Sequence, residues 1–182
     1  RIINLIPVQR QTLLFSATFS PEIKKLAQSY LRSPVTVEVA RQNAAADTVK
    51  QVVHMVSSMD KQRAIVKVLE NRTRQGLSRQ CIIFTNSRLG CAKLARALER
   101  DGIKAGAIHG DKSQGERTLT LEAFKSGAIE ALVATDVAAR GLDIPDMPCV
   151  INHELPFNAE DFIHRIGRTG RAGSKGDAIA LV

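Results

Sequence analysis

Short apolar runs alternate with amphipathic segments from Val49 to the end of the chain. The runs predict strands over 49–56, 81–84, 105–108, 131–134, 149–152 and 177–182. Between them, hydrophobic residues recur at helical spacing and predict helices over 60–74, 87–100, 136–140 and 159–166, with one more that begins after Ser113. The strands lack a polar side, which indicates an α/β fold: a mainly parallel sheet covered by helices on both faces.

The first 48 residues follow a different pattern. An apolar run over 12–15, a helix start at Ser20-Pro21 and the alternation of Val35, Val37 and Val39 predict a strand, a helix and a strand. Three elements are too few to close a core. We expect 1–40 to be a separate piece, the polar, alanine-rich stretch 41–48 to be a linker, and 49–182 to be a domain.

Composition points to a polyanionic partner. The chain has 182 residues, 44% of them hydrophobic, and a net charge of +8, which suits one soluble domain plus a fragment. With six Phe, one Tyr and no Trp, a base-stacking platform is not expected. Recognition of a nucleic-acid backbone through its phosphates is the better interpretation.

The cysteines and the apolar runs bear on location. Cys81, Cys91 and Cys149 lie in or beside apolar segments and have no paired metal spacing, so we expect buried thiols in a reducing compartment, the cytoplasm, and no metal site. No apolar run approaches the ~20 residues needed to cross a bilayer, so no membrane partner is expected. The chain opens at Arg1 without Met and is expected to be part of something longer.

Residues 164–171, His-Arg-Ile-Gly-Arg-Thr-Gly-Arg, place three arginines at a spacing of three. A helix over 159–166 puts His164 and Arg165 in its last turn. Gly167 and Gly170 then release the backbone, so that Arg168 and Arg171 project from a tight connection. Arginine forks fit phosphate oxygens, so the loop is suited to concentrated negative charge. A solvated basic surface, or an Arg-Gly tail that binds nucleic acid loosely, is the alternative.

Polar groups follow three predicted strands at their carboxyl ends, where ligands bind in open parallel sheets. They are Thr85-Asn86-Ser87, His109-Gly110 and Thr135-Asp136. Hydroxyls, helix starts and a glycine would line one rim suited to a sugar-phosphate chain. The alternative is that Ser87, Ser113 and Asp136 only cap helices; Ser113 and Glu116 form a capping box in either case.

Two further patterns are weaker signals, and a third is rejected. Gln114 and Arg117 stand three apart and share a helix face. Asp143 follows the glycine-ended turn at Gly141 and would accept hydrogen bonds from a ribose or from local amides in an Asx turn. The stretch 106–113 is no phosphate-binding loop, because Asp111 separates Gly110 from Lys112.

Taken together, five segments resemble motifs of DEAD-box RNA helicases, of the bacterial RhlE type. They are Ser16-Ala17-Thr18, residues 82–87, 114–117 and 135–143, and residues 164–171. The resemblance implies a RecA-like three-layer sandwich in which 1–40 ends the first RecA-like domain, 41–48 is the linker and 49–182 is the second domain.

The resemblance also implies roles. Arg168 and Arg171 would act as arginine fingers on the γ-phosphate of ATP, and Gly141 and Asp143 would lie at its ribose. The RNA contacts would be Ser87, Gly110, Gln114, Arg117 and Thr135, and the interdomain coupling residues Ser16, Thr18, Arg140, His164 and Arg165.

The implied partners are RNA, ATP with Mg²⁺, and the missing first RecA-like domain, which would hold the phosphates and the metal. The chain alone is then expected to be inactive. A non-catalytic RNA-binding module, or half of a related superfamily-two DNA helicase, remains the alternative.

Overall fold

The computed structural model describes residues 5–16, 20–37, 48–142, 144, 147–170 and 174–182. The chain divides into two compact units, Arg1–Ala44 and Ala45–Val182, which we call the tail unit and the sheet unit. The division falls inside the predicted linker, residues 41–48. Of that stretch only Thr48 is described, so the linker and the domain assignment remain predictions.

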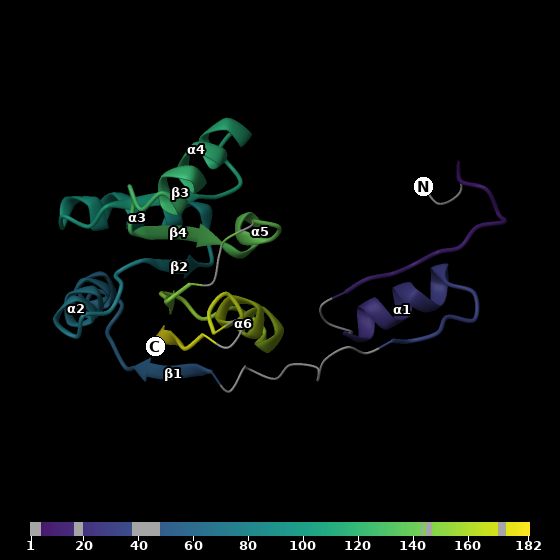
Figure 1. Cartoon of the computed structure of the whole chain (residues 1–182), viewed down its shortest axis with the longest axis horizontal. Helices are drawn as coiled ribbons and strands as arrows, with labels where there is room; N and C mark the ends of the chain where they lie inside the picture. The colour runs from purple at the N-terminus through teal and green to yellow at the C-terminus, as the bar shows by residue number, and fades with distance from the viewer. Residues whose placement is uncertain (1–4, 17–19, 38–47, 143, 145–146, 171–173) are drawn as a thin grey trace. The chain divides into compact units, whose positions relative to one another are not determined.

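The sheet unit is built on one parallel sheet of six strands in the order β1-β6-β5-β2-β4-β3 (Figure 1). The strands are β1 (Val49–His54), β2 (Cys81–Thr85), β3 (Ala105–Ile108), β4 (Ala131–Thr135), β5 (Cys149–Asn152) and β6 (Gly176–Leu181). All six predicted strands are confirmed, with ends that differ by up to two residues.

Five helices of the sheet unit join these strands. They are α2 (Lys61–Arg74), α3 (Arg88–Arg100), α4 (Gln114–Lys125), α5 (Asp136–Ala139) and α6 (Ala159–Ile166). The capping box at the start of α4 is confirmed, because Ser113 Oγ accepts from the Glu116 amide while the Glu116 carboxylate accepts from the Ser113 amide. Gly141, with φ of +72°, adopts the left-handed conformation just after α5, as its predicted end requires.

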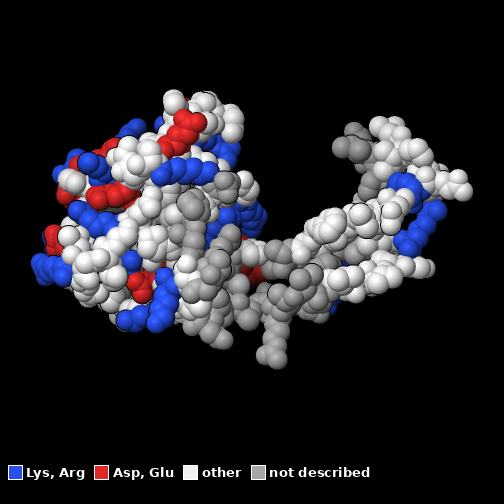
Figure 2. Space-filling view, in the orientation of Figure 1, with Lys and Arg blue, Asp and Glu red and all other residues white. Residues whose placement is uncertain are grey.

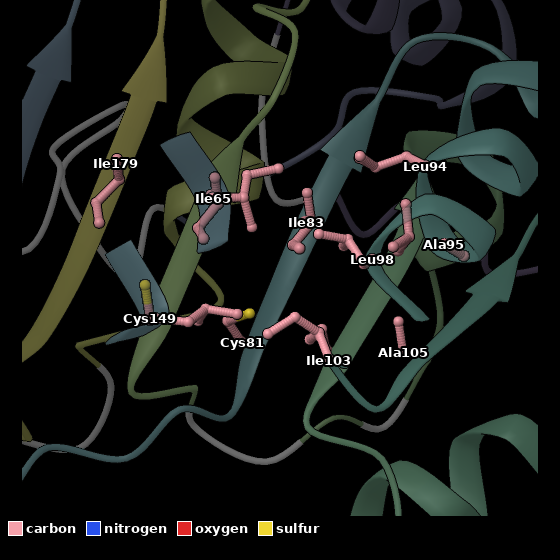
Figure 3. Close-up of a cluster of buried hydrophobic side chains, with 14 of the residues drawn as sticks. Ile65, Cys81, Ile83, Leu94, Ala95, Leu98, Ile103, Ala105, Cys149 and Ile179 are labelled. Carbon is pink, nitrogen blue, oxygen red and sulfur yellow. The ribbon is translucent and has the colours of Figure 1, made fainter. Parts of the chain in front are cut away.

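Helices cover both faces of the sheet, so alternate residues of β2 and β4 are buried on opposite sides, whereas the edge strand β1 has no buried residue. Ile83 and Val133 pack on one face against Ile65 of α2 and Leu98 of α3 (Figure 3). On the other face Ile82, Phe84 and Leu132 pack with Phe124 of α4 and the alanines of α5. Burial of each large side chain stabilises the fold by about 1.5–3 kcal/mol. The predicted three-layer α/β sandwich is confirmed.

The three cysteines are free and buried, as predicted. Burial raises the pKa of Cys91 to about 11 and that of Cys149 to about 12, and it raises the pKa of Cys81 well above its usual value. The thiols therefore stay protonated and unreactive at neutral pH. No described helix is long and apolar enough to span a membrane.

The described residues of the tail unit include the α-helix α1 (Pro21–Tyr30), which begins after Ser20 as predicted; Ser20 Oγ accepts from the Ile23 amide at 3.4 Å. The strands predicted at 12–15 and 35–39 are wrong where the structure describes them, since 12–15 and 35–37 form no strand; 38 and 39 lie outside the described residues. Phe15 is 89% exposed and Val35 is 88% exposed. A strand requires a neighbour for its backbone hydrogen bonds, and the described part of this unit offers none.

Candidate functional site

The sheet order brings the three predicted strand ends together. β4 lies between β2 and β3, with Thr85 opposite Thr135 and Ile108 opposite Ala134. The groups that follow, residues 85–87, 109–110 and 135–136, therefore line one continuous stretch of the carboxyl edge, which we call the rim. Sequence reasoning predicted that each strand ends this way, and the topology makes the three ends neighbours.

The rim combines capping groups with open backbone. The side chain of Ser87 is exposed, and its Oγ accepts from the Gly90 amide at 3.0 Å, so the helix-capping interpretation holds for this residue. Thr135 is 8% exposed and makes no side-chain capping bond to α5. A Cβ on Gly110 would meet Arg88 Cδ only at 3.5 Å, an ordinary contact. The described chain therefore does not require glycine there, and the backbone at Gly110 is accessible to a ligand.

Gln114 and Arg117 share one face of α4, as predicted. Arg117 Nη1 donates to Gln114 Oε1 at 3.4 Å, and Arg117 Nη2 donates to the carbonyl of Ala138 at 3.2 Å. The second bond ties α4 to α5, next to Thr135. Arg117 Nε is buried without a hydrogen-bond partner in the described chain.

Arg165 is the buried centre of the site and is 1% exposed. Its Nε and Nη2 donate to the Asp136 carboxylate at 2.7 and 2.6 Å, and Nη2 also donates to Asn86 Oδ1 at 2.8 Å. Its Nη1 donates to Asn152 Oδ1 at 3.1 Å and to the carbonyl of Glu154 at 2.6 Å. The guanidinium also lies 5.1 Å from the centre of the Phe84 ring.

The role of Arg165 in coupling the two domains stays a prediction, and these contacts show what its side chain binds within the sheet unit. All five of its N–H groups donate within the sheet unit, to the ends of β2, β5 and α5. Sequence reasoning placed Asn86 at the rim without this role, and it missed Asn152 as a site residue. The signal was present for Asn152, a polar residue that closes a fully apolar strand and is 0% exposed.

Arg140, by contrast, lies at the surface. Its Nη2 forms an ion pair with Asp161 Oδ1 at 2.5 Å, and its side chain remains 59% exposed. Asn158 caps α6 by accepting from the Asp161 amide at 2.7 Å, which holds that carboxylate in place. A shallow pocket between α5 and α6 is lined by Arg140, His164 and Arg168, and His164 Nε2 is buried without a hydrogen-bond partner in the described chain.

The loop after α6 is tight, as predicted, but only one of its two described glycines has a special conformation. Gly170 has φ of +69°, whereas Gly167 has φ of −67°. A Cβ at Gly167 would lie 3.0 Å from the Ile163 carbonyl, so glycine there serves close packing. Arg168 is half-buried, and its Nη1 donates to the Leu142 carbonyl at 3.4 Å.

Four site residues remain outside this geometry. Thr18, Asp143 and Arg171 lie outside the described residues. Ser16 belongs to the tail unit, so nothing relates it to the rim. In the described part of the chain, no group of three or more His, Cys, Asp or Glu side chains could hold a metal ion.

Comparisons with known proteins identify the fold. The helicase conserved C-terminal domain family matches residues 60–173. The ATP-dependent RNA helicase DBP2 of Debaryomyces hansenii is 44% identical over 182 residues, which are 100% of this chain and 34% of that protein. The probable ATP-dependent RNA helicase DDX23 of Homo sapiens is 44% identical over 95% of this chain and 21% of that protein. This chain thus spans about a third of the length of DBP2 and less of DDX23.

A solved structure agrees. Dbp5 of S. cerevisiae, bound to RNA and ADP BeF3, superposes with a TM-score of 0.85 at 31% identity over 100% of this chain and 47% of that chain. The RhlE-type branch stays a prediction. With a RecA-like fold and residues 60–173 matched by the family model, this chain belongs to the helicase conserved C-terminal domain family, and over its whole length it is similar to proteins named DEAD-box ATP-dependent RNA helicases.

Proposed function

We propose that this chain is the C-terminal half of an ATP-dependent RNA helicase, which binds the RNA backbone along its rim and supplies arginine fingers to ATP held by a first RecA-like domain. One observation carries the proposal. Arg165 of α6 hydrogen-bonds Asn86 and Asp136 at the rim, so α6, which leads into the loop that carries Arg168, is held directly against the rim. An arrangement of this kind links RNA contacts to contacts with the nucleotide.

The nucleotide half of the proposal rests on Arg168 and Arg171. A half-buried guanidinium on a tight loop can neutralise charge that develops on a transferred phosphoryl group. Gly141 and Asp143 would approach the ribose. When bound, ATP with Mg²⁺ supplies the phosphoryl group. The described residues offer no metal ligand set, so this chain would provide one wall of the site and the first domain the other.

The RNA half rests on the rim and α4. Ser87, Gly110 and Thr135 offer hydroxyls and accessible backbone, and Gln114 and Arg117 add side-chain donors from α4. Contacts of these kinds recognise phosphate and sugar and carry no base sequence. We therefore expect RNA binding with little sequence preference.

Coupling between domains would use Arg140, His164, Ser16 and Thr18. The Arg140–Asp161 ion pair is partly exposed and so can be exchanged for a partner at little cost. Arg165 would contribute to coupling by positioning, since all its donors are used within the sheet unit and hold α6 against the rim.

The tail unit would be the end of the first RecA-like domain. Leu13, Phe15 and Val35 are 68%, 89% and 88% exposed, which is what strands removed from their sheet would show. Residues 41–48 would then be the interdomain linker, and 49–182 the second domain.

The test is RNA-stimulated phosphate release from ATP. We expect none from the 182-residue chain, and turnover when a complete first RecA-like domain precedes it. Turnover by the 182-residue chain alone would contradict the proposal. An RNA-binding module without catalysis would instead bind RNA tightly by itself, with a steep salt dependence, and would show no turnover in either form.

A further inference from the structure

A groove of about 930 Å³ runs along the outer side of α3 in the sheet unit. One end of the groove lies at the carboxyl edge of the sheet, since Ser58 and Met59 follow β1 and His153 follows β5. Along α3 it extends from Gly90 to Arg100. We call it the α3 groove.

One wall of the α3 groove carries a row of cations. Lys93, Arg96 and Arg100 follow helical spacing on one face of α3, and all three are exposed. None of them forms an ion pair with a described residue. Glu99 is the one acid in the groove lining, so three cations there face a single carboxylate. Figure 2 shows Lys and Arg exposed on this side of the unit, interspersed with acidic residues.

The floor of the α3 groove offers little to an apolar ligand. Leu94 and Ala97 are only 6% and 7% exposed, and the one strongly exposed apolar side chain in the lining is Met59, at 92%. Burial lowers the pKa of His153, so this residue is neutral at pH 7 and adds no charge. Charge dominates the surface. This favours a polyanion over an apolar segment of a partner protein.

The α3 groove is continuous with the rim. Ser87, a rim residue, accepts a hydrogen bond from the amide of Gly90, which lines the groove. From Ser87 the helix axis leads away from the rim at about 1.5 Å per residue, so Lys93 and Arg100 are separated by about 10 Å along it. A strand that leaves the rim past Ser87 would meet the three cations in turn.

We infer that a single RNA strand bound at the rim continues into the α3 groove, where Lys93, Arg96 and Arg100 neutralise its phosphates. This rests on the proposed RNA binding by the rim. The site lengthens the bound strand by about three phosphates, one for each cation, and it acts through the backbone of the strand, because the groove lining has no Phe, Tyr or Trp for a base to stack on.

The test compares oligouridines of six and twelve nucleotides on the 182-residue chain at low salt, by fluorescence anisotropy and by amide chemical shifts. We expect the longer strand to bind about tenfold more tightly. The triple variant Lys93→Glu, Arg96→Glu, Arg100→Glu should lose that gain and lower the salt slope by about 2, since each phosphate contact contributes roughly 0.7.

A charge-matched control separates a site from net charge. The control residues are Lys67, Arg74 and Lys104, which are exposed and form no ion pair with a described residue. The triple variant in which all three are changed to Glu should still bind the longer RNA more tightly than the shorter one. Urea unfolding midpoints of both variants should match the parent. Equal losses in the two variants, or equal affinity of the parent for both lengths, would overturn the inference.

The amide shifts distinguish failure of the inference from failure of the proposed function. Shifts at Thr135 and Gly110 without shifts at Gly90 and Ala97 would support RNA binding at the rim and would contradict binding in the α3 groove. Shifts at Gly90 and Ala97 alone would contradict both, because the strand would not come from the rim. A twelve-residue oligoglutamate that shifts the α3 amides as strongly as RNA would indicate an acidic protein partner instead.

Discussion

Two arginines three positions apart, Arg165 in the last turn of α6 and Arg168 in the loop after it, have different surroundings. Arg165 is 1% exposed and donates five hydrogen bonds within the sheet unit, whereas Arg168 is half-buried and its side chain reaches the Leu142 carbonyl at 3.4 Å. The resemblance to helicase motifs gave Arg168 a role at the γ-phosphate and Arg165 a role in coupling the domains. The difference shows that Arg165 ties the ends of β2, β5 and α5 together, whereas Arg168 remains partly exposed beside Leu142.

The largest effect on ATP turnover is expected from Arg168. In a chain with its first RecA-like domain present, Arg168→Ala should lower RNA-stimulated ATP turnover by about 10³-fold, the scale for arginine fingers, because charge on the transferred phosphoryl group loses its partner. Steady-state phosphate release measures it. A loss of less than about tenfold would remove Arg168 from the role.

Arg165 should contribute most to the stability of the sheet unit. Arg165→Met leaves Asp136, Asn86 and Asn152 without their donor, and it should lower the free energy of unfolding by about 3 kcal/mol, the lower end for a broken buried pair. The lower end of that range applies because the Asp136 side chain is 24% exposed, so water can partly solvate the carboxylate left without its partner. Urea unfolding measures it.

A matched change at the surface provides the control for Arg165. Arg140→Ala breaks an ion pair whose Arg side chain is 59% exposed, and it should cost less than about 1 kcal/mol. Equal stability of the Arg165→Met chain and its parent would show that the buried network contributes nothing.

At the rim, Thr135→Ala should weaken RNA binding about fivefold to tenfold, the scale of one lost hydrogen bond, and leave nucleotide affinity unchanged. Titration of RNA and of nucleotide into the same two-domain chain checks both. Thr73→Ala on α2, whose hydroxyl bonds the Leu69 carbonyl, is the control and should change neither. An unchanged RNA affinity for the Thr135 variant would count against the rim.

The smallest effect concerns the start of α4, which positions Gln114 and Arg117. Hydrogen bonds from Lys112 and from Ser113 lower the pKa of Glu116 from 4.5 to about 2. Because the folded pKa is depressed, the stabilisation is complete above about pH 4.5 and is lost as pH falls toward 2. Glu116→Gln should lower the urea midpoint slightly at pH 7, and that difference should shrink below pH 4.5. A difference that stays constant down to pH 3 would contradict this origin.

Local sequence signals predicted the elements well. The helix starts at Ser20, Ser87 and Ser113 lie where capping residues predict them, and the apolar runs form the strands of the sheet. Caps and periodicity depend on residues within a few positions of one another, so they can be recognised without the rest of the fold. Clustering of polar groups after three strands could likewise be predicted.

What the sequence could not decide depends on residues far apart along the chain. Arg165 turns inward because Asn86, 79 positions away, and Asp136, 29 positions away, meet it where β2 and β4 end side by side. Residues 12–15 and 35–37 have strand-like patterns yet form no strand, because a strand exists only when another lies beside it. The sequence by itself determined which segments are helices and strands in the sheet unit and where its polar groups gather. Only the tertiary structure decided which arginine is buried, since that depends on which acceptors the sheet order brings within hydrogen-bonding distance.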